Sequence, residues 1–356
     1  FTQQNSPERF NLIKDTYEDF IRKGTLIQED ESKIYLYRQT KDGHEYTGII
    51  AGASISEYLD NKIKVHEATI TNREEMFTNY LNTVGYNAEP VLLTYSDSDN
   101  KIDSQFASII AKRPEYEFAT IDEMKHELWI LTAQEQSSIQ SSFDALEHVY
   151  IADGHHRSAS SVGLSKLRST NEERRFKNDE AFLAFFINES RIHIHEFNRI
   201  IRNLNGHTKE EIIELLQINF EIKSISKARK PSKQHEFTMF IDDEWYVLDC
   251  KSTIIDTQHP VNSLDAQILT DYVLTPILNI EDLKKSKDID FLSGDISLED
   301  FQDEIHKKDF KIGFVLYPIS IEDIKKVADN EMIMPPKSTW IEPKLRSGLT
   351  IYSLNE

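Results

Sequence analysis

At 356 residues the chain is long enough for two hydrophobic cores, and its 39% hydrophobic and 29% charged residues are typical of a folded globular protein. Its 61 acidic and 41 basic side chains give a net charge of −20, which argues against nucleic-acid and membrane binding. The single cysteine excludes an internal disulfide. With no apolar run of transmembrane length and no signal-peptide pattern, we expect a cytoplasmic protein.

The first 200 residues alternate between helical and extended patterns. The clearest feature is residues 33–54, where two alternating strands flank an Asp42-Gly43 turn and predict a β-hairpin. Apolar spacing and glycine stops predict helices at 5–27, 54–62, 71–85, 133–148, 158–167 and 179–188, and strands at 89–97, 149–152 and 191–201.

A polar turn at 203–208 is the best boundary between domains. Beyond it the pattern predicts helices at 209–220, 264–278 and 321–330, a hairpin at 237–250 and a strand at 309–320. We therefore expect an α/β (mixed α+β) protein with two lobes, an N-terminal domain over 1–205 and a C-terminal domain over 206–356.

The segment "YIADGHHRSAS" carries the strongest functional signal. A strand ends at Asp153, Gly154 turns the chain, and His155, His156 and Arg157 begin a helix. Helix N-termini favour anions, and arginine matches phosphate oxygens. Asp153 suits a Mg²⁺ contact or proton abstraction from a hydroxyl. An Asp cap with exposed histidines is the alternative, but the flanking strand and helix favour an anion site.

Two other segments could add to such a site. In "KVHEATI", Glu67 could act as a general base and His66 as its proton partner or a phosphate contact, although a helix-capping role for the segment is equally consistent with the pattern. The loop "MPPKSTWIEPKLRSG" gathers cations and hydroxyls suited to phosphate in Lys337, Ser338, Thr339, Lys344 and Arg346. A solvated basic loop is the alternative there.

Other chemistries find little support. No P-loop, dinucleotide-binding glycine motif or serine elbow occurs. His155 and His156 diverge on a helix, and His193 and His195 share a strand face without a third ligand nearby, so zinc is disfavoured.

Four segments in this order, at 64–70, 150–160, 191–206 and 334–349, resemble the bacterial and archaeal family known as domain of unknown function 1015. The turn at 153–157 is in turn similar to the phosphate-binding turn of the ParB and sulfiredoxin superfamily. His155 stands where sulfiredoxins have their catalytic cysteine, which argues against sulfinic-acid reduction. In free-serine kinases the turn is Asp-Gly-His-Thr-Arg, so only His156 departs from that pattern.

The resemblance implies a ParB/sulfiredoxin-like first lobe and a nucleotide-dependent phosphotransferase with ATP or ADP, Mg²⁺ and a small hydroxyl substrate, L-serine first. Gly154, His155, His156 and Arg157 would hold the phosphates, and Asp153 or Glu67 would take the hydroxyl proton. Lys337 and Lys344, in the loop of the second lobe, would close over the anion. A ParB-like regulatory module that binds a nucleotide without turnover is the alternative function.

Overall fold

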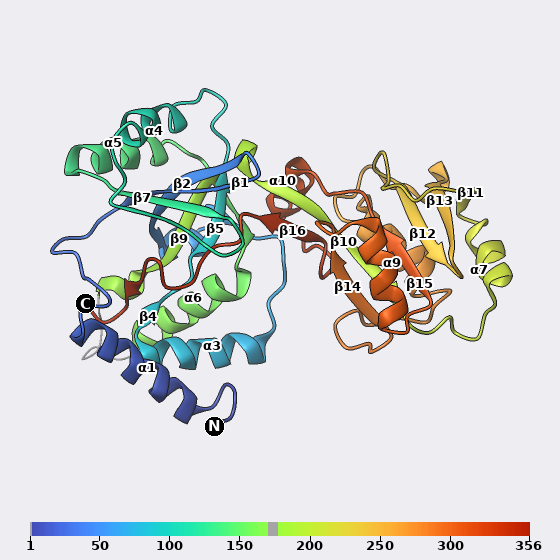
Figure 1. Cartoon of the computed structure of the whole chain (residues 1–356), viewed down its shortest axis with the longest axis horizontal. Helices are drawn as coiled ribbons and strands as arrows, with labels where there is room; N and C mark the ends of the chain where they lie inside the picture. The colour runs from blue at the N-terminus through green and yellow to red at the C-terminus, as the bar shows by residue number, and fades with distance from the viewer. Residues whose placement is uncertain (1, 170–176) are drawn as a thin grey trace. The chain divides into compact units, whose positions relative to one another are not determined.

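The computed structural model describes residues 2–169 and 177–356 (Figure 1). Its α-helices are α1 (Pro7–Arg22), α2 (Ile55–Leu59), α3 (Thr71–Val84), α4 (Asp103–Ile110), α5 (Ala133–Phe143), α6 (His155–Ser169), α7 (Lys209–Leu216), α8 (Asp265–Leu269), α9 (Leu298–Lys307) and α10 (Ile321–Asp329). Shorter helical turns are η2 (Lys177–Glu180), η3 (Glu189–Arg191), η4 (Ser252–Ile254) and the π-helical η5 (Thr270–Leu274).

The strands belong to three sheets. In chain order they are β1 (Tyr35–Lys41), β2 (His44–Ser54), β3 (Ile63–Lys64), β4 (Tyr86–Asn87), β5 (Val91–Tyr95), β6 (Tyr116–Ala119), β7 (Lys125–Ile130), β8 (Val149–Asp153), β9 (Ala181–Asn188), β10 (His193–Ile201), β11 (Phe220–Ile225), β12 (Glu236–Ile241), β13 (Glu244–Cys250), β14 (Ile289–Ser293), β15 (Ile312–Val315), β16 (Thr339–Glu342) and β17 (Tyr352–Ser353). Helices and sheets mix throughout, which confirms the expected α/β class.

The chain forms two compact units. Unit 1 comprises Phe1–Val65, Thr69–Ile192 and Pro343–Glu356, and unit 2 comprises His66–Ala68 and His193–Glu342. These bounds differ from the ranges 1–205 and 206–356 expected from the sequence. β10 pairs with β14, β15 and β16 and so lies in unit 2, whereas β17 pairs with β4 and returns the last segment to unit 1.

Unit 1 is built on an 8-stranded mixed sheet with the order β3-β8-β5-β9-β2-β1-β7-β6. β3 runs parallel to β8 and β5 parallel to β9, while the other neighbours are antiparallel. α4 and α5 cover one part of the sheet through Phe106 and Ile139, and α6 covers another through Val162. α3 packs beside α6, and α1 beside α3 (Figure 1).

The predicted hairpin is present as β1 and β2. Asp42 and Gly43 both have positive φ, 51° and 81°, as the two-residue turn of a hairpin requires. The predicted helix at 179–188 is wrong, because Ala181–Asn188 is the strand β9, which lies between β5 and β2. A central strand is apolar on both faces, so its continuous apolar run lacks the alternation that marks a strand.

Unit 2 has an antiparallel sheet in the order β11-β13-β12-β15-β10-β14, with β16 also paired to β10. Its main core packs α7, α8 and η5 against this sheet, and a second cluster packs α9 against it. The single helix expected at 264–278 is instead the short α8 followed by η5. Among the residues described, no helix combines the length and the apolar character that crossing a membrane would need.

Candidate functional site

β8 leads into α6 through Gly154, as the sequence predicts. Gly154 has φ +106°, a backbone conformation that residues with a Cβ rarely adopt. Its carbonyl accepts hydrogen bonds from the N–H groups of Arg157 (2.9 Å) and Ser158 (3.1 Å), which closes the first turn of α6. The positive end of the helix dipole therefore lies directly after Asp153, where it favours an anion.

α6 is held in place by α3. A Cβ on Gly163 would lie 2.6 Å from Thr78 Oγ1, and Thr78 donates a hydrogen bond to the carbonyl of Ser160 at 3.2 Å. His155 at the start of α6 is buried, with 5% of its surface exposed, and His156 is partly exposed. The buried position of His155 argues against the alternative of two exposed histidines on a simple capping turn.

The guanidinium of Arg157 folds back over Gly154. A Cβ at Gly154 would lie 3.1 Å from the Arg157 Cζ, so a larger residue there would displace the arginine. Arg157 donates to the carbonyl of Pro90, and its nitrogens lie 3.1 Å from Glu89 Oε1 and 3.7 Å from Asp153 Oδ2. The close approach of Arg157 to the backbone and the positive φ both explain why residue 154 is a glycine.

Lys344 reaches the same carboxylate from the last segment of the chain. Its Nζ lies 3.3 Å from Asp153 Oδ2. In the sequence Lys344 belongs with the loop of the expected second domain, but the structure places it in unit 1. The segment is anchored there because Gly348 N–H donates to the carbonyl of Ala88 at 2.7 Å and Ser347 Oγ to Glu89 Oε2 at 3.3 Å.

We call Asp153, Gly154, Arg157, Lys344 and Glu89 the DGHHR cluster. Its two cations and two carboxylates balance in charge, and the helix terminus adds a partial positive charge. The side chains of Asp153, Arg157 and Lys344 are 41%, 29% and 42% exposed, so solvent and a ligand can reach them. Chemically, the cluster can hold a phosphate group by exchanging carboxylate contacts for phosphate contacts.

The cluster offers little for a metal ion held by protein alone. Mg²⁺ commonly combines one or two carboxylates with substrate phosphates and water. Asp153 supplies one carboxylate, and its Oδ2 already contacts both cations. Within the ranges 2–169 and 177–356, no group of three or more His, Cys, Asp or Glu side chains is placed to hold a metal.

Five of the predicted site residues lie in unit 2, namely His66, Glu67, Lys337, Ser338 and Thr339. His66 is buried, with 2% of its surface exposed, and its carbonyl accepts the N–H of Met334 at 2.8 Å, whereas Glu67 is exposed. The ammonium of Lys337 lies 5.2 Å from the centre of the Phe197 ring.

Ser338 and Thr339 are fixed by backbone contacts within unit 2. Ser338 is buried, and its hydroxyl donates to the carbonyl of Pro335 at 2.7 Å. Thr339 pairs with Glu196 between β16 and β10. The structure thus joins His66 to the loop before β16 inside unit 2 and joins Lys344 to Asp153 inside unit 1.

Sequence reasoning missed Glu89. Glu89 precedes β5 and stands next to Pro90 in the sequence. Nothing in the local sequence marks it as a partner of Arg157, which lies 67 positions beyond Pro90. Arg346, expected as a phosphate contact, instead donates to Asp122 Oδ2 at 2.7 Å and to Thr120 at 3.2 Å. Burial, and secondarily the charge of Arg346, lowers the pKa of nearby His126.

Comparison with solved structures finds distant likenesses. A free serine kinase in complex with AMP is 14% identical with a TM-score of 0.42, and the match covers 86% of this chain and 92% of that one. SbnI with a C-terminal truncation, from Staphylococcus aureus, is 12% identical with a TM-score of 0.44, covering 86% and 87%. A conserved hypothetical protein from Pyrococcus furiosus is 14% identical with a TM-score of 0.40, covering 84% and 94%.

A comparison with curated proteins finds no match. A family model described as "Protein of unknown function (DUF1015)" matches residues 1–267, which is most of the chain and includes the whole β8–α6 turn. The segments at 64–70, 150–160 and 191–206 fall within this match, and the segment at 334–349 lies beyond it. The chain therefore belongs to the DUF1015 family, as the sequence predicts.

Proposed function

We propose that the DGHHR cluster binds the phosphates of a nucleotide. The observation that carries the proposal is the convergence of Arg157 and Lys344 on Asp153 at the N-terminus of α6. Two cations beside a helix N-terminus form an anion site, and Gly154 lets the ligand approach the backbone. His155 and His156 belong to the first turn of α6 and would contribute its backbone donors.

We further propose that the protein is a phosphotransferase that acts on a small hydroxyl compound, with L-serine as the first candidate and ATP or ADP as donor. This rests on the similarity of the turn at 153–157 to that of free-serine kinases. Asp153 or Glu67 would take the hydroxyl proton, and His66 would be its proton partner or a phosphate contact. Lys337, Ser338 and Thr339 would contact phosphate oxygens. Mg²⁺ would be held by Asp153 together with phosphate oxygens and would neutralise phosphate charge.

A non-catalytic nucleotide-binding module is the second candidate. The observation that favours it is the double contact of Asp153 Oδ2 with Arg157 and Lys344. A carboxylate that holds two cations in place for an anion serves binding without any proton transfer. In that case the site would bind a nucleotide and signal its presence without turnover.

One assay distinguishes the kinase from the non-catalytic module. The protein is incubated with Mg²⁺, L-serine and either ATP or ADP, and phosphoserine is measured. The kinase proposal expects product from one donor, reduced at least about 100-fold in Asp153→Asn. Asp303→Asn, an exposed carboxylate on α9, is the matched control and should keep full activity. Nucleotide binding without product from any small alcohol would favour the module, and no nucleotide binding would refute both.

A further inference from the structure

Unit 1 contains a pocket of about 260 Å³ at the other end of β8 from the DGHHR cluster. Val149 at the start of β8 lines it, and Asp153 ends the strand roughly 13 Å further along. The walls come from β2, from Phe186 of β9, and from α5 with the turn that follows it. No predicted site residue lines this pocket.

Small residues on β2 leave the hollow open. Ala51 and Ala53 line it from the same face of the strand, and larger side chains at these two positions would reduce its volume. Phe143 and Phe186 form an aromatic wall, with ring centres 5.3 Å apart and planes at 74°. Both rings are only partly buried although they pack against the core, so they offer apolar surface to a ligand.

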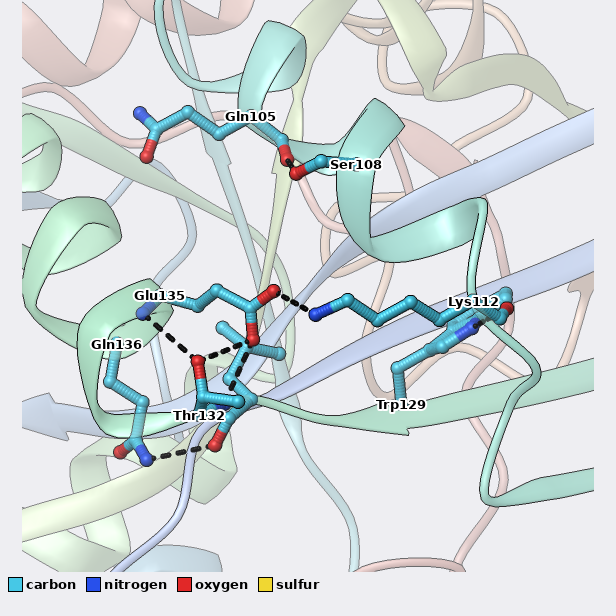
Figure 2. Close-up of polar contacts among 8 residues, drawn as sticks. Gln105, Ser108, Lys112, Trp129, Thr132, Glu135 and Gln136 are labelled. Atoms are coloured by element: carbon cyan, nitrogen blue, oxygen red, sulfur yellow. Dashed lines mark hydrogen bonds and ion pairs between the residues drawn. The ribbon is translucent and has the colours of Figure 1, made fainter.

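The wall formed by α5 is held by polar contacts that Figure 2 shows in part. Thr132 and Glu135 form a capping box at the start of α5. Glu135 also accepts a hydrogen bond of 2.5 Å from the Nζ of Lys112, which follows α4 in the chain. Gln105 on α4 donates to Ser142 on α5 at 2.8 Å. These contacts fix α5 and its pocket residues before any ligand arrives, so binding would need little reordering.

The rim of the pocket is predominantly acidic. Lys62 is paired with Glu57 at 3.3 Å, which cancels one charge of each sign. Asp144 and Glu147 remain as exposed carboxylates, with His148 Nε2 3.7 Å from Glu147. The other ring nitrogen of His148 is buried and has no hydrogen-bond partner among the described residues.

We infer that this pocket binds a small apolar amine, with its hydrocarbon or aromatic body against Phe143 and Phe186 and its ammonium at the Asp144 and Glu147 rim. The net negative charge of the protein favours a cationic ligand at longer range as well. This site is independent of the nucleotide chemistry proposed for the other end of β8.

Calorimetric titration with 2-phenylethylamine, 2-phenylethanol and phenylacetate tests the inference, because the three share an aromatic body and differ in charge. The amine should bind at least about tenfold more tightly than the alcohol, and phenylacetate should bind most weakly. Asp144→Asn, an exposed change, should reduce the preference for the amine about threefold while leaving alcohol binding unchanged.

Ala51→Leu should lower the affinity for amine and alcohol alike by about tenfold or more, because its side chain would occupy the pocket. Asp303→Asn is the charge control and should change nothing. Equal affinity for the three probes, an unchanged preference in Asp144→Asn, or no binding at millimolar concentration would overturn the inference. Because Asp144 is exposed, its variant tests the charge claim even if Ala51→Leu fails to fold.

Discussion

The ammonium of Lys344 lies 3.3 Å from the carboxylate of Asp153 across 191 positions of sequence. The contact joins the last segment of unit 1 to the end of β8, beside the first turn of α6. It gives the DGHHR cluster a second cation that does not come from its own helix.

Lys344→Ala should weaken nucleotide binding. Removing one cation near the phosphates while leaving Asp153 and Glu89 in place makes the site net negative, and we expect a loss of about 5- to 20-fold in affinity at low salt. Calorimetric titration with ATP and ADP measures it. Lys285→Ala, an exposed lysine of unit 2, is the control. Wild-type affinity in Lys344→Ala would contradict the proposed role.

Glu89→Gln should act in the opposite direction. It removes the carboxylate 3.1 Å from the Arg157 guanidinium and thereby frees that group for phosphate. We expect ATP to bind about three- to tenfold more tightly, with the gain lost as salt rises. The same titration at two salt concentrations checks the result. A weaker complex would mean that Glu89 positions Arg157 and does not compete with the ligand.

Gly154→Ala should destabilise unit 1 for two reasons, the positive φ and the contact of the new Cβ with Arg157. We expect a loss of about 2–3 kcal/mol in the free energy of unfolding, measured by urea denaturation. Gly24→Ala is the matched control, because Gly24 has φ +68° and a Cβ added there would meet no atom within 4 Å. It should lose only about 1 kcal/mol. Equal losses would show that the arginine contact contributes nothing.

The strand-turn-helix at 149–169 and the hairpin at 33–54 could be predicted from sequence, because each is defined by local turn chemistry and periodicity. β9 could not, since a central strand has the same continuous apolar run as a buried helix. The position of Lys344 beside Asp153 could not be predicted from the sequence either. No local sequence pattern predicts that the segment after β16 brings Lys344 to Asp153. The contact of Glu89 with Arg157 is likewise made between residues far apart in the sequence.

Unit 2 should lose stability in acid through Glu236. Hydrogen bonds, first from Arg229 and then from Ser232, lower the pKa of Glu236 from 4.5 to about 2. Because folding favours the ionised carboxylate, its contribution is complete above about pH 4.5 and is lost as pH falls towards 2. Glu236→Gln should therefore lose on the order of 2 kcal/mol at pH 7 and much less at pH 2.5.

Urea unfolding of wild type and Glu236→Gln at pH 7, 4 and 2.5 measures that difference. Glu281→Gln, an exposed glutamate of the same unit, is the control and should match wild type at each pH. A stability difference that stays constant from pH 7 to 2.5 would show that the Glu236 carboxylate charge is not what Arg229 and Ser232 stabilise.

The DGHHR cluster is proposed to recognise the phosphates of its ligand. Titrating ATP and adenosine into the wild-type protein by calorimetry at fixed Mg²⁺ and salt tests it most directly, because the two ligands differ only in their phosphates. We predict that ATP binds at least about 100-fold more tightly than adenosine, and that the difference shrinks as salt is raised. Equal affinities, or no binding of ATP at millimolar concentration, would show that the cluster does not recognise phosphate.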